Sequence, residues 1–353
     1  MRRFIVKIIL ALIPKRKWRQ YLQSEFDFFD LNTDKIYNKQ YGKIYVPIYS
    51  RYHKMYNKEP EIYNKDGSSI RTFFLRDKCF SASNPQVSKY FIFDKYNFEL
   101  PVHFYTHNCM KQTLKRKGTF IAEKMFGLLC ESKEILPNDY LIFDRHPGLN
   151  KDFDLIFTYD EDILNKYDNA REFCQCANIS LGDNITDDEL NACLTKNKNI
   201  SIISSDKKSC ELHKLRFEWA THFEKDDKVD TFGTFNGGKY VRAIDTLKNY
   251  RYSIVVENAI LPFWFTEKIL NCFATYTVPI YVGHSNILKR FNSDGIIFVP
   301  EKDFDHIDEI IKQCSAQDYE QRLPAIMDNY KRVQQYKNSY DLLWEKYLKN
   351  ILN

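Results

Sequence analysis

A regular alternation of short apolar runs with helical patterns over residues 197–300 constrains the fold more than any other feature of the chain. The runs are rich in β-branched and aromatic side chains, which is typical of buried strands. The segments between them carry apolar residues at helical spacing, such as Leu212, Leu215, Trp219 and Phe223. Strands that alternate with helices form a parallel, doubly wound α/β sheet. The predicted strands are residues 199–204, 229–233, 251–256, 279–283 and 295–299.

The first half of the chain carries weaker signals of the same kind. Residues 111–131 read as a helix with one apolar face, and residues 305–352 have helical patterns throughout. We expect two α/β domains, over residues 23–196 and 197–353, because a domain usually takes about 150 residues. The predicted strands of the first domain are residues 90–94, 101–107, 140–143 and 153–158.

The charge of the chain is concentrated at its N-terminus. The formal net charge is +5, from 52 basic and 47 acidic residues, and a group of basic residues precedes the first acid, Glu25. The rest of the chain is therefore close to neutral. A general nucleic-acid binder needs a basic stripe, so nucleic acid is not an expected partner.

Residues 1–22 have the pattern of a segment that lies on a membrane surface. Residues 4–13 are apolar apart from Lys7, Pro14 ends the run, and a basic cluster follows over residues 15–19. The run is too short to span a bilayer but suits an interfacial helix on anionic headgroups, with an ordinary core helix as the alternative. The nine cysteines form no Cys-x-x-Cys pair, which favours reduced thiols. We expect a cytoplasmic protein, peripherally associated with the inner face of the membrane.

The third strand of the C-terminal half is followed by residues suited to an anionic ligand. Ligands of such sheets bind at the carboxyl ends of the strands, where Glu257 and Asn258 stand. Thr266, Glu267 and Lys268 then begin a helix. A lysine in the first turn opposes the helix dipole, which suggests a bound anion that outweighs the penalty. The alternative is a capping pair with a solvated lysine.

Arg216, like Lys268, is predicted near the start of a helix. It is predicted in the first turn of the helix that follows residues 199–204. Two cations at two helix starts would form a clamp for a diphosphate.

Three blocks carry a family resemblance. They are residues 250–258 (Tyr-Arg-Tyr-Ser-Ile-Val-Val-Glu-Asn), 265–269 (Phe-Thr-Glu-Lys-Ile) and 277–283 (Thr-Val-Pro-Ile-Tyr-Val-Gly). In this order and spacing they resemble the signature of the α1,3/4-fucosyltransferases, glycosyltransferase family 10, of the bacterial type. Residues 229–233 and Arg216 also fit that pattern.

The resemblance implies a GT-B-like fold, in which two Rossmann-like α/β domains face each other across a cleft. It implies a GDP-sugar donor, usually GDP-fucose, held by the C-terminal domain without a metal ion. In the family, the equivalents of Arg216 and Lys268 hold the diphosphate, that of Glu267 holds the ribose, and that of Asn258 lies near the donor sugar. Trp264 stands where the family usually has tyrosine, so a hydroxyl is lost at that position.

The acceptor half resembles the family less. Bacterial members have a Gly-Glu-Asn stretch that supplies the catalytic base, ahead of a segment that residues 153–161 resemble. The same spacing counted back leads to Asp144, the predicted general base, with His146 as its competitor. An exposed turn is the structural alternative for both. His103 and His107 would lie about 13 Å apart on a strand, too far to share a metal ion, and are candidate residues on the acceptor side.

The function that this resemblance implies is inverting transfer of L-fucose from GDP-fucose to a hydroxyl of a glycan acceptor. The acceptor would be lipopolysaccharide or another lipid-linked or surface oligosaccharide. No cofactor is expected, since the Asp-x-Asp sequences at residues 152–154 and 160–162 arise easily by chance among 47 acids. Two alternatives stay open. One is a glycosyltransferase for another nucleotide sugar, with or without a metal ion. The other is a non-catalytic glycan-binding protein with the same fold.

Overall fold

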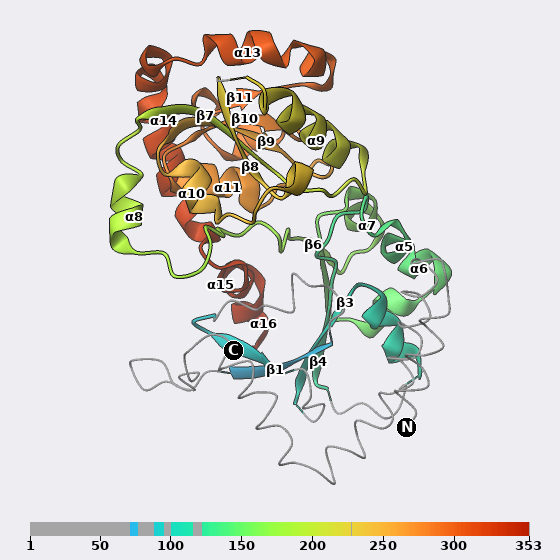
Figure 1. Cartoon of the computed structure of the whole chain (residues 1–353). Coiled ribbons are helices and arrows are strands. Elements are labelled where there is room, and N and C mark those ends of the chain that lie inside the picture. The colour runs from blue at the N-terminus through green and yellow to red at the C-terminus, as the bar shows by residue number, and fades with distance from the viewer. Residues whose placement is uncertain (1–70, 77–87, 95–99, 116–121, 227, 353) are drawn as a thin grey trace, which may run out of the picture. The chain divides into compact units, whose positions relative to one another are not determined.

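A parallel sheet of five strands organises the C-terminal part of the chain (Figure 1). The computed structural model describes residues 71–76, 88–94, 100–115, 122–226 and 228–352. The strand order is β11-β10-β9-β7-β8, and each neighbouring pair runs parallel. All five predicted strands are thereby confirmed. They are β7 (Lys198–Ser204), β8 (Val229–Gly233), β9 (Tyr250–Val256), β10 (Val278–Val282) and β11 (Ile297–Phe298).

Both faces of this sheet are covered by helices. Ile202, Ile254 and Ile280 lie in register on adjacent strands and share one core with side chains of α9, α13 and α14. Because side chains alternate along a strand, the intervening residues face the other way. Helices α10 and α11 pack against that side of the sheet and against each other (Figure 1). This doubly covered sheet confirms the predicted α/β class.

The helices of this part fill the connections that the sequence predicted. Helix α9 follows β7, α10 precedes β9, and α11 joins β9 to β10. Their bounds are α7 (Glu161–Lys166), α8 (Asp187–Ala192), α9 (Glu211–Phe223), α10 (Ala243–Leu247), α11 (Glu267–Ala274), α12 (Ile287–Arg290), α13 (Ile307–Gln313), α14 (Ala316–Val333), α15 (Ser339–Leu343) and α16 (Lys349–Leu352).

A second sheet lies nearer the N-terminus, with strand order β2-β1-β3-β4-β5-β6. Strand β1 pairs parallel with β2 and β3, and β5 pairs parallel with β6. The predicted strands at residues 90–94, 101–107 and 153–158 are confirmed. The strands are β1 (Arg71–Arg76), β2 (Phe91–Asp94), β3 (Val102–Thr106), β4 (Lys124–Leu128), β5 (Leu155–Thr158) and β6 (Ala170–Glu172).

Two predictions for the first half are wrong. The predicted helix over residues 111–131 is a 3-10 segment, η1 (His107–Lys115), followed by β4, in which Phe126 and Leu128 are buried two residues apart. The predicted strand at residues 140–143 is instead α5 (Pro137–Tyr140) followed by α6 (Ile142–Arg145). Pro137 at the first helical position favours this start, and a short apolar run suits a buried helix as well as a strand.

Contacts divide the chain into two units. One takes in the described residues up to Gly127 together with His146–Asp154, and the other takes in Leu128–Arg145 and the chain from Leu155 onward. The predicted domain boundary at residue 196 stays a prediction. The predicted membrane-contact segment, residues 1–22, lies outside the described residues. Within the part of the chain that the structure describes, no helix is long and apolar enough to cross a bilayer.

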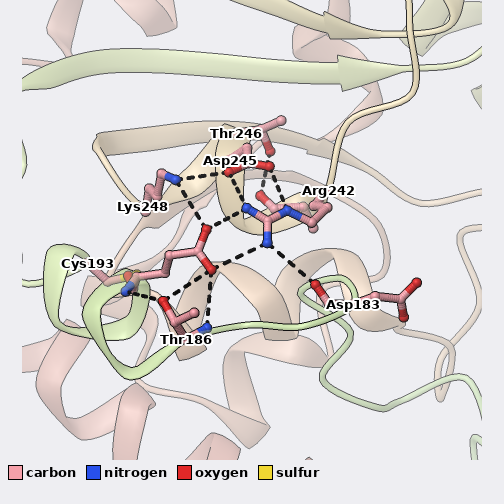
Figure 2. A network of polar contacts seen from close by, with 9 residues as sticks. Asp183, Thr186, Cys193, Arg242, Asp245, Thr246 and Lys248 are labelled. Carbon is pink, nitrogen blue, oxygen red and sulfur yellow. Dashed lines mark hydrogen bonds and ion pairs between the residues drawn. The ribbon is translucent and has the colours of Figure 1, made fainter. Parts of the chain in front are cut away.

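A charged network fixes α8 beside α10 (Figure 2). Thr186 and Glu189 form a reciprocal capping box at the start of α8. Arg242 donates to Asp245, with 2.9 Å between Nε and Oδ2, and its Nη2 atom lies 2.5 Å from Glu189 Oε1. Lys248 adds a 2.9 Å ion pair to Asp245. The α8 segment, which buries none of its helical residues, is thus held by polar contacts rather than by a core.

Candidate functional site

The carboxyl end of β9 carries a buried carboxylate. Glu257 directly follows the strand and has no exposed surface. Its two oxygens accept hydrogen bonds from Thr266, from the backbone nitrogen at 2.9 Å and from Oγ1 at 2.7 Å. Burial raises the pKa of the Glu257 carboxyl, and the Lys268 ammonium opposes that rise. Glu257 therefore fixes the first residue of the next helix to the end of this strand.

The start of α11 places Lys268 at that strand end. Thr266 is the N-cap, as predicted, and its side chain accepts from the backbone nitrogen of Lys268. The Lys268 Nζ atom lies 3.0 Å from Thr266 Oγ1, 3.2 Å from Glu267 Oε1 and 3.6 Å from Glu257 Oε2. Burial would lower the pKa of Lys268, but the carboxylates of Glu267 and Glu257 raise it. The ammonium is therefore charged and fixed in position.

Glu267 lies at the edge of this group. Burial would raise its pKa, but the Lys268 ammonium and its hydrogen bond hold the pKa below its usual range. Its side chain is 39% exposed, so an ionised carboxylate faces outward beside Lys268. A carboxylate in this position accepts hydrogen bonds from hydroxyl groups.

Arg216 lies deeper than the sequence predicted. It is the sixth residue of α9, so it belongs to the second turn and not to the first. It is only 8% exposed; Nη1 donates to the Val256 carbonyl oxygen at 3.3 Å, and Nε is buried without a hydrogen-bond partner. The guanidinium interacts electrostatically with Glu267 and Glu257. A buried guanidinium with an unused donor is costly unless a ligand completes it.

Two further polar atoms without a hydrogen-bond partner lie on the segment between β9 and α11. Asn258 Oδ1 and Trp264 Nε1 are both buried without a hydrogen-bond partner. The Trp264 ring packs on Tyr159, with 4.5 Å between ring centroids. All five predicted donor-binding residues thus lie on α9 or on the segment from β9 to α11. Three of them carry unused hydrogen-bonding atoms, which suits a polar ligand.

The structure adds a carboxylate that the sequence analysis missed. Glu131 accepts a hydrogen bond from Asn258, with 3.3 Å between Nδ2 and Oε1, and another from its neighbour Ser132 N at 2.7 Å. The incorrect helix over residues 111–131 hid this residue. A glutamate that directly follows the apolar run of β4 and residues 129–130 is the signal that could have found it.

The predicted base, Asp144, lies elsewhere on the same unit. It is on α6 and not after a strand, its side chain is 54% exposed, and Lys166 Nζ pairs with it at 2.5 Å. His146 is half-buried, and its carbonyl oxygen accepts from Leu149 N. The role of either residue as a base stays a prediction.

The two histidines predicted on the acceptor side are both buried. His103 lies on β3, and its Nδ1 atom is 3.1 Å from Tyr105 Oη. His107 follows the strand with a φ of 49° and begins η1. Their contact with an acceptor stays a prediction.

The four acids of the Asp-x-Asp sequences have structural contacts. Thr113 donates to Asp152, and Lys124 pairs with Asp154 at 2.8 Å. Lys133 pairs with both Asp160 and Asp162 at 2.9 Å. Among the described residues, no group of three His, Cys, Asp or Glu side chains is arranged to hold a metal ion.

Comparison with known proteins finds a family model that matches the C-terminal part. Residues 193–350 match the family model described as Glycosyltransferase family 10 (fucosyltransferase) C-term. This range contains Arg216, Asn258, Trp264, Glu267 and Lys268.

Two curated proteins match shorter stretches. The alpha-(1,3)-fucosyltransferase FucT of Helicobacter pylori is 30% identical over 106 residues, which cover 30% of this chain and 18% of that protein. R654 of Acanthamoeba polyphaga mimivirus, provisionally named as a fucosyltransferase, is 34% identical over 59 residues, 17% of this chain and 10% of the relative. The matches thus span only a small part of these curated relatives.

Solved structures are similar at low identity. An alpha1,3-fucosyltransferase with GDP has a TM-score of 0.49 and 16% identity, over 87% of this chain and 96% of its own length. The alpha1,3-fucosyltransferase with GDP-fucose has a TM-score of 0.45 and 15% identity, over 75% and 90%.

Proposed function

We propose, because residues 193–350 match the model of glycosyltransferase family 10, that this chain transfers L-fucose from GDP-fucose to a hydroxyl group of a glycan acceptor. The observation that carries the proposal is the pair of cations at the carboxyl end of the C-terminal sheet. Arg216 is buried with an unused Nε donor, and Lys268 is held at the start of α11 by Glu257, Glu267 and Thr266. A diphosphate supplies the negative charge and the acceptor atoms that such a pair binds.

The reaction is a single displacement. The acceptor oxygen bonds to the anomeric carbon as the bond from that carbon to the β-phosphate oxygen breaks, so the configuration inverts. The acceptor proton passes to a carboxylate, and GDP leaves with the bonding electron pair. Arg216 and Lys268 stabilise the charge that grows on the diphosphate, so the proposal requires no divalent metal ion.

Two carboxylates are candidates for the base. Asp144 is the one that the sequence predicts. The contacts favour Glu131, because its oxygen accepts from Asn258 at the end of β9, whereas Asp144 is ion-paired with Lys166 on an exposed surface. Glu267 accepts hydrogen bonds from hydroxyl groups of the donor. Trp264 lies three residues before it, on the segment between β9 and α11.

The proposal for the acceptor and the location is based on the sequence alone. We propose a lipid-linked or surface oligosaccharide, such as lipopolysaccharide, at the cytoplasmic face of a membrane. The basic segment over residues 1–22 would bring the enzyme to anionic headgroups. A longer acceptor-binding surface would then come from the N-terminal part of the chain.

The test is product formation from GDP-fucose with acceptors that end in galactose, glucose or N-acetylglucosamine, with and without EDTA. Wild type is compared with Lys268→Ala and with Lys214→Ala, a control for an exposed lysine on α9. Transfer that resists EDTA, is lost in Lys268→Ala and persists in Lys214→Ala supports the proposal. Transfer that needs a metal ion, or binding of another nucleotide sugar instead, contradicts it. Glycan binding without any nucleotide-sugar binding would indicate the non-catalytic alternative.

A further inference from the structure

A buried histidine lies one helical turn before Arg216. His213 is the third residue of α9 and is 6% exposed. Residues three apart on a helix lie on the same face, so the imidazole and the guanidinium are neighbours on one side of α9. The family signature recognised in the sequence does not include His213.

One polar contact orients the imidazole ring. His213 Nδ1 lies 3.0 Å from Ser209 Oγ, in the loop before α9. A serine hydroxyl donates to a neutral Nδ1 atom or accepts from a protonated one. When Ser209 donates to a neutral ring, Nε2 carries its only proton, and in the imidazolium both nitrogens carry one. In these two forms Nε2–H is the donor left for a ligand.

The charges around His213 are cationic and come from three segments. Arg216 is on the same helix, Lys268 is on α11, and Lys207 is in the loop before α9. Burial lowers the pKa of His213 most, and these three cations lower it further, to about 4. Cys210 is the N-cap of α9; burial raises the pKa of its thiol, the Arg216 guanidinium lowers it and the Glu134 carboxylate raises it.

The positive charge around His213 is what an anion-binding site requires. Glu257 and Glu267 offset part of the charge of Arg216 and Lys268, but a neutral imidazole beside three cations contributes nothing to that balance. A bound diphosphate reverses the local potential, because two negative charges then lie among the cations. The protonated imidazole, which is disfavoured in the free protein, becomes favoured in the complex.

We propose that His213 is a third phosphate-binding residue, which binds the diphosphate of the nucleotide sugar through Nε2–H in its imidazolium form. The proposal rests on the proposed function, since it assigns a further residue to the same site. It couples donor binding to the uptake of one proton, and Ser209 accepts the Nδ1 proton of the charged ring. Donor affinity therefore rises as the pH falls.

The experiment measures GDP-fucose binding by calorimetry at pH 6 and pH 8, in two buffers that differ in ionisation enthalpy. GDP-fucose is a better probe than GDP, because its phosphates are diesters and have no second ionisation near pH 6. The proteins are wild type, His213→Gln, Ser209→Ala and His222→Gln. His222 is the matched control, since it lies on the same helix but is exposed and contacts Asp308.

The expected result is that wild type binds more tightly at pH 6 than at pH 8 and takes up protons on binding. Because the pKa of His213 in the free protein is about 4, the gain from pH 8 to pH 6 depends on the pKa in the complex. It is about twofold if that pKa reaches 6 and about tenfold if it reaches 7. His213→Gln loses both the gain and the proton uptake, Ser209→Ala weakens binding at pH 6, and His222→Gln behaves as wild type. Thermal unfolding of each variant shows whether it is folded.

Other outcomes overturn the proposal. If His213→Gln and Ser209→Ala bind as wild type does, or if wild type takes up no proton, His213 is not a phosphate-binding residue in the imidazolium form. That failure differs from failure of the proposed function. If the proposed function fails, wild type itself does not bind GDP-fucose. If only the role of His213 fails, wild type binds GDP-fucose and Lys268→Ala does not.

Discussion

Asn258 Nδ2 donates to Glu131 Oε1 at 3.3 Å, and this hydrogen bond places a carboxylate at the end of β9. The other amide atom of the residue, Asn258 Oδ1, is buried and has no hydrogen-bond partner. Asn258 thus connects Glu131 on one side with an unused acceptor on the other. A base that acts on an acceptor hydroxyl must lie near the donor sugar, and in the proposed function the contact with Asn258 would give Glu131 such a position.

Replacing Glu131 should therefore affect the chemical step. Glu131→Gln keeps an oxygen for Asn258 but cannot take a proton, so we expect kcat to fall by about 100-fold or more with little change in the KM for GDP-fucose. The measurement is steady-state transfer with GDP-fucose and the best acceptor of the panel.

Asp144→Asn is the matched comparison for that variant. It removes only an exposed ion pair with Lys166, which solvent screens, and should leave kcat unchanged. The reverse pattern, in which Asp144→Asn is inactive and Glu131→Gln is active, would assign the base to Asp144.

The sequence predicted the C-terminal half well because its signals are local. Its β-branched runs, its helical spacing and the Gly233 turn each determine a conformation over a few residues. The first half lacks such signals. Met125 and Leu128 fit a helical face, yet the segment pairs as a strand, because sheet formation depends on partners far along the chain.

The site was predicted only where a motif marks it. Thr266 and Lys268 were assigned to a helix start, and the structure places them there. The contacts of Glu257 could not be foreseen, since burial of a carboxylate and the donors that satisfy it appear only in three dimensions. Glu131 was missed because it depends on the conformation of the segment before it.

Glu257 should be needed both for stability and for donor binding. Gln at this position has only one acceptor oxygen for the two Thr266 donors and no charge for Lys268. We expect Glu257→Gln to lower the free energy of unfolding by about 1 to 3 kcal/mol and to weaken GDP-fucose binding. Denaturant unfolding and calorimetry check both effects. Glu218→Gln, an exposed change on α9, should alter neither, and unchanged donor affinity in Glu257→Gln would contradict a positioning role.

Gly233 should tolerate no side chain. It ends β8 with a φ of 109°, and an added Cβ would lie 1.8 Å from the Ser204 carbonyl oxygen on the neighbouring strand. Gly237 also has a positive φ, 79°, but has no atom within 4 Å of an added Cβ. We expect Gly237→Ala to cost about 1 to 2 kcal/mol from backbone strain alone and Gly233→Ala to cost clearly more. Equal losses in denaturant unfolding would show that the close approach does not matter.

Lys196 should make the stability of the chain depend on alkaline pH. Its Nζ atom donates to the carbonyl oxygens of Leu247, Lys248 and Thr275 at 3.0, 3.1 and 2.6 Å, so it caps the ends of both α10 and α11. Burial lowers the pKa of Lys196 from 10.5 to about 8. Between these two values the unfolded chain binds more protons than the folded one, so the free energy of unfolding rises with pH.

The comparison of Lys196→Met with wild type isolates this effect, because the tyrosine and cysteine titrations are common to both proteins. From pH 7.5 to 10, the free energy of unfolding of wild type should rise relative to that of Lys196→Met, by at most about 3 kcal/mol. Urea unfolding at several pH values measures the difference, with the exposed Lys225→Met as the control. A constant difference across this range would mean that the three carbonyl oxygens keep the ammonium charged in spite of its burial.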